Sequence, residues 1–278
     1  MKHPDNSEIK TSRFDNLFAP VKKLIMNNIQ KSRNNRIIAK TAHKSDIIIG
    51  AAIGYSDDQI KPFILSLKSS GYKGRLVLFV DKLDSGAVSF LIEQEIELIR
   101  QISHRDNAMP VYGHRYYEFL DFLRKEQGVK RIMLTDVRDV IFQGNPFVGC
   151  GDESLYVFSE DSSVKLGQCP YNSEWVLNLY GNDILKKISG EIIICSGVTI
   201  GGYHNILGYL DLLCNEMSIN PQIPIADQGA HNVLIGFQVS LSSTTNQGQY
   251  TLFTMSAQTG SELIEMEDSL SMMEADRL

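Results

Sequence analysis

The chain has 278 residues, 43% hydrophobic and 22% charged, and a formal net charge of −6 at pH 7. These proportions are ordinary for a globular protein. The length suits one large domain or two small ones, and the negative net charge argues against a nucleic-acid partner. No apolar stretch approaches the ~20 residues of a membrane span, and residues 1–11 lack the apolar core of a secretory signal. Four cysteines without a CxxC pair indicate free thiols, so we expect a cytoplasmic protein; peripheral membrane association through residues 18–26 is an alternative.

The first half of the chain alternates apolar runs with amphipathic segments. Residues 1–44, which are basic from Lys22 to Lys44, predict an N-terminal helical arm. Ser56 and Gln59 match a capping box, which predicts a helix from there to about Gly71. The periodicity predicts strands over 46–53, 75–80 and 96–99 and a strand ending at Asp136, with further helices over 87–94 and around 116–128. This alternation predicts βαβ units and a mostly parallel sheet.

The second half is less regular. Strands are expected over 155–158 and 192–202, and helices over 203–217 and 227–234. The segment 165–182 holds an aromatic group, Tyr171, Trp175 and Tyr180, which favours either a sugar-stacking platform or core packing. We therefore predict one α/β domain over 45–255, with halves 45–147 and 148–255, followed by a flexible tail over 256–278.

The run Asp136-Val137-Arg138-Asp139 places clustered charges at the end of a buried strand. Such a cluster is costly unless something binds it, and strand ends in α/β proteins are where ligands usually bind. The chain has no GxGxxG or GxxxxGK[ST] loop and no GxSxG turn. Their absence argues against a dinucleotide enzyme, a P-loop NTPase and a serine hydrolase of the nucleophile-elbow type.

Two further features follow the acid cluster: the small-residue break Cys195-Ser196-Gly197-Val198 and the pair Asp227-Gln228 at the start of a helix. In this order, over residues 46 to 236, the three features resemble the GT-A glycosyltransferases, especially the retaining type with a DxD motif. The resemblance implies a GT-A-like, Rossmann-type α/β fold. Its central sheet would be mostly parallel and flanked by helices, with a mixed second half.

The resemblance also implies roles for individual residues. Donor binding falls to a set at the strand ends and on the helix before the acid cluster: Ala52, Tyr55, Asp81, Arg115, Arg138, Ser196 and Gly197. Asp227 would bind sugar hydroxyls and Gln228 would lie near the anomeric carbon. The residues alone also allow structural roles. Tyr55 and Asp81 could be surface polar residues, and Arg115 could be an exposed residue at a helix start. Ser196 and Gly197 could form a plain bulge, and Asp227 could cap a helix.

The family implies a divalent cation, Mn²⁺ or Mg²⁺, held here by Asp136 and Asp139. The chain departs from the DxD pattern, because Arg138 occupies the second acid position and no histidine follows His231. Two alternatives therefore stay open. Arg138 could clamp the diphosphate without an ion, or the three charges could form an ion-pair knot that only orders the turn.

The expected function is transfer of a sugar from a nucleoside-diphosphate donor to an acceptor hydroxyl, with retention favoured. The acceptor could be a carbohydrate, a lipid-linked molecule or a protein, and a homo-oligomer is open. The alternatives are a nucleotidyltransferase and a non-catalytic nucleotide-sugar-binding or scaffold protein of the same fold.

Overall fold

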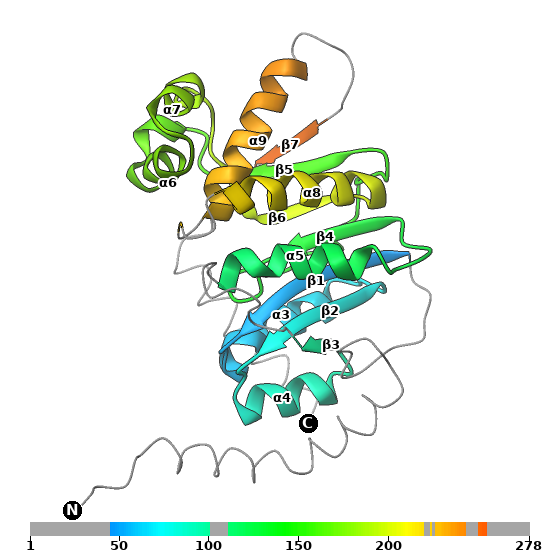
Figure 1. Ribbon diagram of the computed structural model, residues 1–278. Coiled ribbons are helices and arrows are strands. Elements are labelled where there is room, and N and C mark those ends of the chain that lie inside the picture. The colour runs from blue at the N-terminus through cyan, green and yellow to red at the C-terminus, as the bar shows by residue number, and fades with distance from the viewer. Residues whose placement is uncertain (1–44, 101–110, 220–222, 224–225, 243–249, 255–278) are drawn as a thin grey trace, which may run out of the picture.

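The computed structural model describes residues 45–100, 111–219, 223, 226–242 and 250–254. Within these residues a single sheet has the strand order β3-β2-β1-β4-β6-β5-β7, and helices cover both of its faces (Figure 1). The predicted arm over 1–44, its membrane-binding segment and the tail over 256–278 lie outside the described residues. The predicted α/β class with a mostly parallel sheet is confirmed.

The first half builds the parallel part of the sheet. Strands β1 (Asp46–Ile53), β2 (Arg75–Asp81), β3 (Glu97–Arg100) and β4 (Arg131–Thr135) pair in parallel. Helices α3 (Asp57–Ser69), α4 (Ser85–Glu93) and α5 (Val111–Leu123) alternate with these strands along the chain. Strand β1 lies between β2 and β4, which explains why its sequence is apolar on both faces.

Local signals set the helix boundaries in this half. The Gln59 side chain accepts a hydrogen bond from the Ser56 N–H at 3.0 Å, as the capping-box pattern predicted. Helix α3 ends just before Gly71, whose φ of +78° is readily adopted by glycine. Asp84 caps α4 by accepting a hydrogen bond from the Ala87 N–H at 2.7 Å.

The second half mixes strand directions. Strand β6 (Ile194–Gly202) is antiparallel to both β4 and β5 (Leu155–Ser159), and β7 (Tyr250–Thr254) is parallel to β5. Pairing between β5 and β6 jumps from Val157–Thr199 to Phe158–Cys195, so residues 196–198 form an irregularity in the ladder. The break predicted around Gly197 is therefore present, as a bulge inside a continuous strand.

Several elements were not predicted from the sequence. They are the short 3-10 helix η1 (Leu166–Gln168), helices α6 (Pro170–Tyr180) and α7 (Asn182–Ile188), and strand β7. Helix α6 begins with a proline at its first position and ends at Gly181, whose φ is +78°. Proline at a helix start and glycine just past its end are usable signals, and both were present in the sequence.

The helices pack on the two faces of the sheet in separate hydrophobic clusters. Alternating residues of β1 point to opposite faces, with Ile47 and Ile49 in one cluster and Ile48 in the other. Helices α5, α8 (Tyr203–Ile219) and α9 (Ala226–Ser242) contribute to the Ile47 side, and α3 and α4 to the Ile48 side. A third cluster joins η1, α6, α7 and α9 through Leu166, Val176, Ile188 and Val233.

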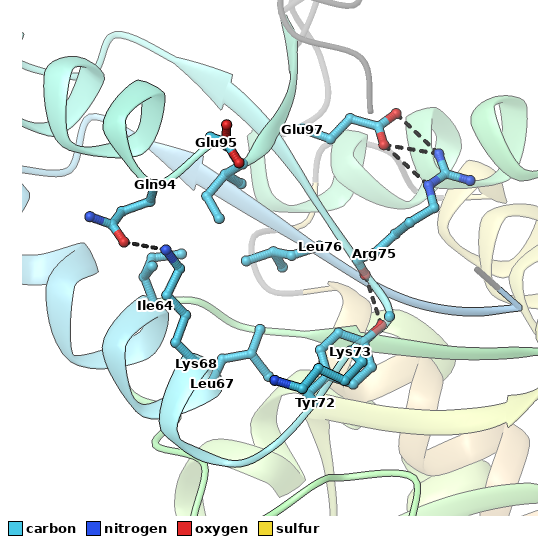
Figure 2. A pocket seen from close by; sticks show the side chains of 12 residues that line it. Ile64, Leu67, Lys68, Tyr72, Lys73, Arg75, Leu76, Gln94, Glu95 and Glu97 are labelled. Atoms are coloured by element: carbon cyan, nitrogen blue, oxygen red, sulfur yellow. Dashed lines mark hydrogen bonds and ion pairs between the residues drawn. The ribbon is translucent and has the colours of Figure 1, made fainter. Parts of the chain in front are cut away.

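The amino ends of β2 and β3 carry a buried ion-pair network beside a small hollow. Arg75 contacts Glu97 at 3.0 Å and Glu126 at 2.5 Å. The hollow, about 190 Å³, lies between the end of α3, the end of α4 and these strand starts (Figure 2). It is thus at the end of the sheet opposite to the acid cluster, and the predicted site residues do not line it. No helix in the described part of the chain is long and apolar enough to cross a membrane.

Candidate functional site

The order of the parallel strands creates a switch point between β1 and β4. From β1 the chain moves outward through β2 to β3, and it then returns to the other side of β1 as β4. The connections leaving β1 and β4 therefore diverge, and the carboxyl ends of strands at such a switch point are where α/β proteins usually bind ligands. Tyr55 follows β1 and Asp136 follows β4, so two of the predicted site residues flank this point.

Asp136 is in direct contact with the bulge of β6. Its N–H donates a hydrogen bond to the Gly197 carbonyl at 2.8 Å. A Cβ atom on Gly197 would lie 2.7 Å from Asp136 Oδ2, closer than such atoms approach one another. The acid turn and the small-residue strand, 61 positions apart in the chain, thus pack against each other, and a larger residue at 197 would displace the Asp136 carboxylate.

Arg115 connects three elements at this unit. From α5, its guanidinium pairs with Asp136 and also with Asp227 of α9, the latter at 3.3 Å. It donates a further hydrogen bond to the Tyr116 hydroxyl at 3.0 Å, and its side chain is only 14% exposed. The alternative of an exposed helix-start arginine is therefore wrong. A self-contained ion-pair knot of Asp136, Arg138 and Asp139 is also wrong, because Asp136 pairs with Arg115 of α5.

Burial and charge act in opposite directions on this cluster. Burial disfavours the charge of Arg115, but the oxygens of Tyr116, Asp136 and Asp227 outweigh it and raise the arginine pKa well above its usual value. Burial raises the pKa of Asp227, and the nearby Arg115 only partly offsets that rise. The centre therefore holds one permanent cation between two carboxylates, one of which is buried.

Three further predicted residues, Tyr55, Arg138 and Asp139, follow the carboxyl ends of β1 and β4. Burial raises the pKa of Tyr55, whose hydroxyl also feels the charges of Arg138, Asp136, Asp139 and Arg115. Arg138 and Asp139 are both exposed on the turn after β4. These two strand ends thus combine a half-buried aromatic ring with a solvent-facing cation and anion.

The Gln228 side chain connects three elements through hydrogen bonds. Its Oε1 accepts from the Ser196 N–H at 2.8 Å, while its Nε2 donates to the Ile194 carbonyl at 3.0 Å and to Asn172 at 3.1 Å. Nε2 also contacts Glu160 at 3.3 Å, and burial raises the pKa of that carboxyl. Gln228, on α9, therefore connects the start of β6 to α6. Its partner Ser196 is the residue just before Gly197.

The remaining predicted residues lie further from the centre. The Ala52 side chain is fully buried in the cluster beneath α3, so any contact it made with a ligand would come from its backbone. Asp81 ends β2, one strand beyond the switch point, and its carbonyl accepts a hydrogen bond from the Gly54 N–H at 2.9 Å. Asp227 lies in the first turn of α9, which begins at Ala226.

Sequence reasoning missed the residues that surround the centre formed by Arg115, Asp136 and Asp227. They are Tyr116, Glu160, Asn172, Tyr209, His231 and Asn232, contributed by five separate elements or loops. No local pattern marks them, because each acquires its role from a partner far away in the chain. Only the position of Tyr116 beside Arg115 was a signal within reach.

The buried pair of Tyr209 and His231 gives a prediction about pH. The Tyr209 hydroxyl lies 2.7 Å from His231 Nδ1, and burial lowers the pKa of His231 to about 3. Between pH 6.5 and 3, His231 is protonated in the unfolded chain and neutral in the native state, so the free energy of unfolding falls as the pH drops. We expect the step from pH 7 to pH 5 to cost roughly 2 kcal/mol through this residue. Urea unfolding of wild type and His231→Gln at both pH values measures it, and equal losses in the two proteins would contradict the assignment.

Comparisons with known proteins give limited similarity. No protein-family model and no curated protein matches the chain. Similar solved structures include the galactosyltransferase LgtC in complex with donor and acceptor sugar analogues. That match has a TM-score of 0.42 and 15% identity over 68% of this chain and 70% of that one. An active-site mutant of LgtC matches with a TM-score of 0.43 and 13% identity over 68% and 69%. At these scores, functional inference depends on the geometry of the site itself.

Proposed function

We propose that this chain is a GT-A-type glycosyltransferase, which moves a sugar from a nucleoside-diphosphate donor to an acceptor hydroxyl. One observation carries the proposal: Tyr55 and Asp136 flank the β1–β4 switch point, with Arg115 largely buried beside Asp136 and charged residues exposed on the turn after β4. Such a switch point suits an elongated nucleotide ligand. The GT-A assignment itself is part of this proposal.

The charges on the turn after β4 suit a diphosphate. Arg138 is exposed there, and a planar guanidinium can bind phosphate oxygens in a bidentate manner. The half-buried ring of Tyr55, at the end of β1, offers an apolar surface on the side proposed for the base. Ser196 is partly exposed on β6 and is proposed to contact the donor sugar, whereas Gly197 is buried and allows Asp136 to approach the backbone of β6.

A divalent cation, Mn²⁺ or Mg²⁺, remains part of the proposal. Within the described residues no three His, Cys, Asp or Glu side chains are grouped so as to hold a metal ion. Mg²⁺ bound with substrate phosphates needs only one or two carboxylates, which Asp136 and Asp139 can provide. Once bound, the ion would neutralise charge on the leaving diphosphate. Arg138 is the candidate for the same role without an ion.

Asp227 and Gln228 are proposed to act on the transferred sugar. Asp227 would bind sugar hydroxyls, and Gln228 positions Ser196, Asn172 and Glu160. A direct contact between Gln228 and the sugar would require it to exchange one of those hydrogen bonds. Retention is favoured, with the leaving phosphate accepting the acceptor proton; in an inverting reaction Asp227 would be the base, and its raised pKa strengthens it in that role.

One observation favours a non-catalytic alternative. Asp136 and Asp227 both pair with Arg115, so a sugar-binding protein could use the same site without turnover. The cytoplasmic location is likewise a proposal, supported by the four free thiols of Cys150, Cys169, Cys195 and Cys214.

A thermal-shift screen of UDP-, GDP- and dTDP-sugars, with and without Mn²⁺, tests donor binding. A ligand at about 100 times its Kd should stabilise the native state by roughly 2.7 kcal/mol. Release of nucleoside diphosphate in the presence of acceptors then tests transfer. Binding without turnover supports the non-catalytic alternative. A nucleotidyltransferase would instead release pyrophosphate from a nucleoside triphosphate and a sugar phosphate. If no nucleotide-sugar shifts the melting temperature, the proposal is contradicted.

A further inference from the structure

Helix α6 presents two aromatic rings on its surface. Tyr171 is 68% exposed and Trp175, one turn later, is partly buried. Their ring centroids are 6.2 Å apart and their planes are inclined by 35°. The third residue of the predicted aromatic group behaves differently, because Tyr180 packs against the core and donates a hydrogen bond to Glu216 at 2.8 Å. Core packing is therefore confirmed for Tyr180, and sugar stacking stays a prediction for Tyr171 and Trp175.

The helix that carries the pair is held firmly against α9. A Cβ atom on Gly229 would lie 2.7 Å from the Leu179 side chain and 3.2 Å from the Trp175 carbonyl, so the two helices approach at backbone distance. Val176 is fully buried on the same contact face. The helix that carries the two aromatic rings is therefore fixed in place by close packing against α9.

Helix α6, which carries the pair, is hydrogen-bonded to the proposed transfer centre. Asn172, next to Tyr171, accepts a hydrogen bond from Gln228 at 3.1 Å, and Gln228 holds the Ser196 N–H at 2.8 Å. Glu160 contacts the same Gln228 Nε2 at 3.3 Å. The start of α6, the bulge of β6 and Glu160 are therefore joined through one side chain.

From this geometry we propose that Tyr171 and Trp175 form a stacking platform for a neutral pyranose ring of the acceptor. The proposal rests on the transferase function proposed above and narrows its acceptor to a carbohydrate. The C–H face of a pyranose is apolar and packs on aromatic rings, while its hydroxyls can donate hydrogen bonds to acceptors such as Glu160 and the exposed Glu174. The same carboxylates disfavour the anionic surface of a phospholipid bilayer.

Trp175 makes this proposal directly measurable, because it is the only tryptophan of the chain. We expect the Trp175 emission of the full chain to change saturably with at least one member of a panel of methyl pyranosides and neutral disaccharides. Tyr171→Ala should weaken that binding by about tenfold, and Tyr171→Phe, which keeps the ring, should leave it near wild type. Leu177→Ala is the matched control, since Leu177 is an exposed residue of the same helix at 43%.

The outcomes separate this proposal from the transferase proposal. If no glycoside alters the emission, or if Tyr171→Ala binds as tightly as wild type, the platform is wrong even when nucleotide-sugars stabilise the protein. A response to anionic phospholipid vesicles in place of glycosides would also overturn it. Glycoside binding in a protein that no nucleotide-sugar stabilises would instead refute the transferase and keep the platform as a sugar site. Nucleotide-sugar stabilisation should be equal in wild type and Tyr171→Ala.

Discussion

Asp136→Asn is expected to lower the rate of sugar transfer by about 100-fold or more, with only a small change in unfolding free energy. Asparagine keeps the shape of the side chain but removes the charge that faces Arg115 and the proposed diphosphate site. The substituted side chain is 35% exposed in wild type, which limits the structural cost. Initial rates of nucleoside-diphosphate release, measured with the donor found in the thermal-shift screen, check this prediction.

Two companion variants sharpen the Asp136 experiment. Gly197→Ala places a methyl group 2.7 Å from Asp136 Oδ2 and should also reduce transfer, because the carboxylate must move while its charge is kept. Asp183→Asn removes an exposed acid of α7 and should leave the rate unchanged. Undiminished activity in Asp136→Asn would refute the assigned site, whatever the result with Gly197→Ala.

The sequence was most informative at the strand ends. Hydrophobic periodicity predicted the parallel strands, and Tyr55 and Asp136, which the resemblance assigned to the donor site, follow the carboxyl ends of two that are paired. The break at Gly197 was visible because small residues interrupt an apolar run. Its contact with Asp136 follows from the antiparallel pairing of β4 and β6, which the sequence did not predict.

The parts that escaped prediction depend on long-range contacts. Arg115 and Asp227 are 112 positions apart, and nothing near either residue marks them as partners. Helix α6 escaped because its aromatic and polar composition obscured the apolar face formed by Val176 and Leu179. As a result, the contact of Asn172 with Gln228, which ties α6 to the centre, could not be expected.

Arg115→Met should lower the free energy of unfolding by about 3–5 kcal/mol, since breaking a buried ion pair leaves an uncompensated charge. Asp227 is the residue left behind, with its side chain 7% exposed. Urea unfolding at pH 7 measures the loss. Arg124→Met is the matched control: Arg124 pairs with Asp211 on the surface, with side chains 52% and 48% exposed, and such pairs contribute about 1 kcal/mol or less.

A double-mutant cycle with Asp227→Asn isolates the interaction within this centre. If the cost of Arg115→Met comes from the stranded carboxylate, adding Asp227→Asn should recover part of the lost stability. The pH dependence gives an independent check. Without Arg115, burial is opposed only by backbone hydrogen bonds and raises the Asp227 pKa further, so the native state keeps a proton that the unfolded chain releases above about pH 3.8. The penalty of Arg115→Met should therefore shrink as the pH falls towards that value. A penalty no larger than that of Arg124→Met, and independent of pH, would show that Arg115 does not hold the centre together.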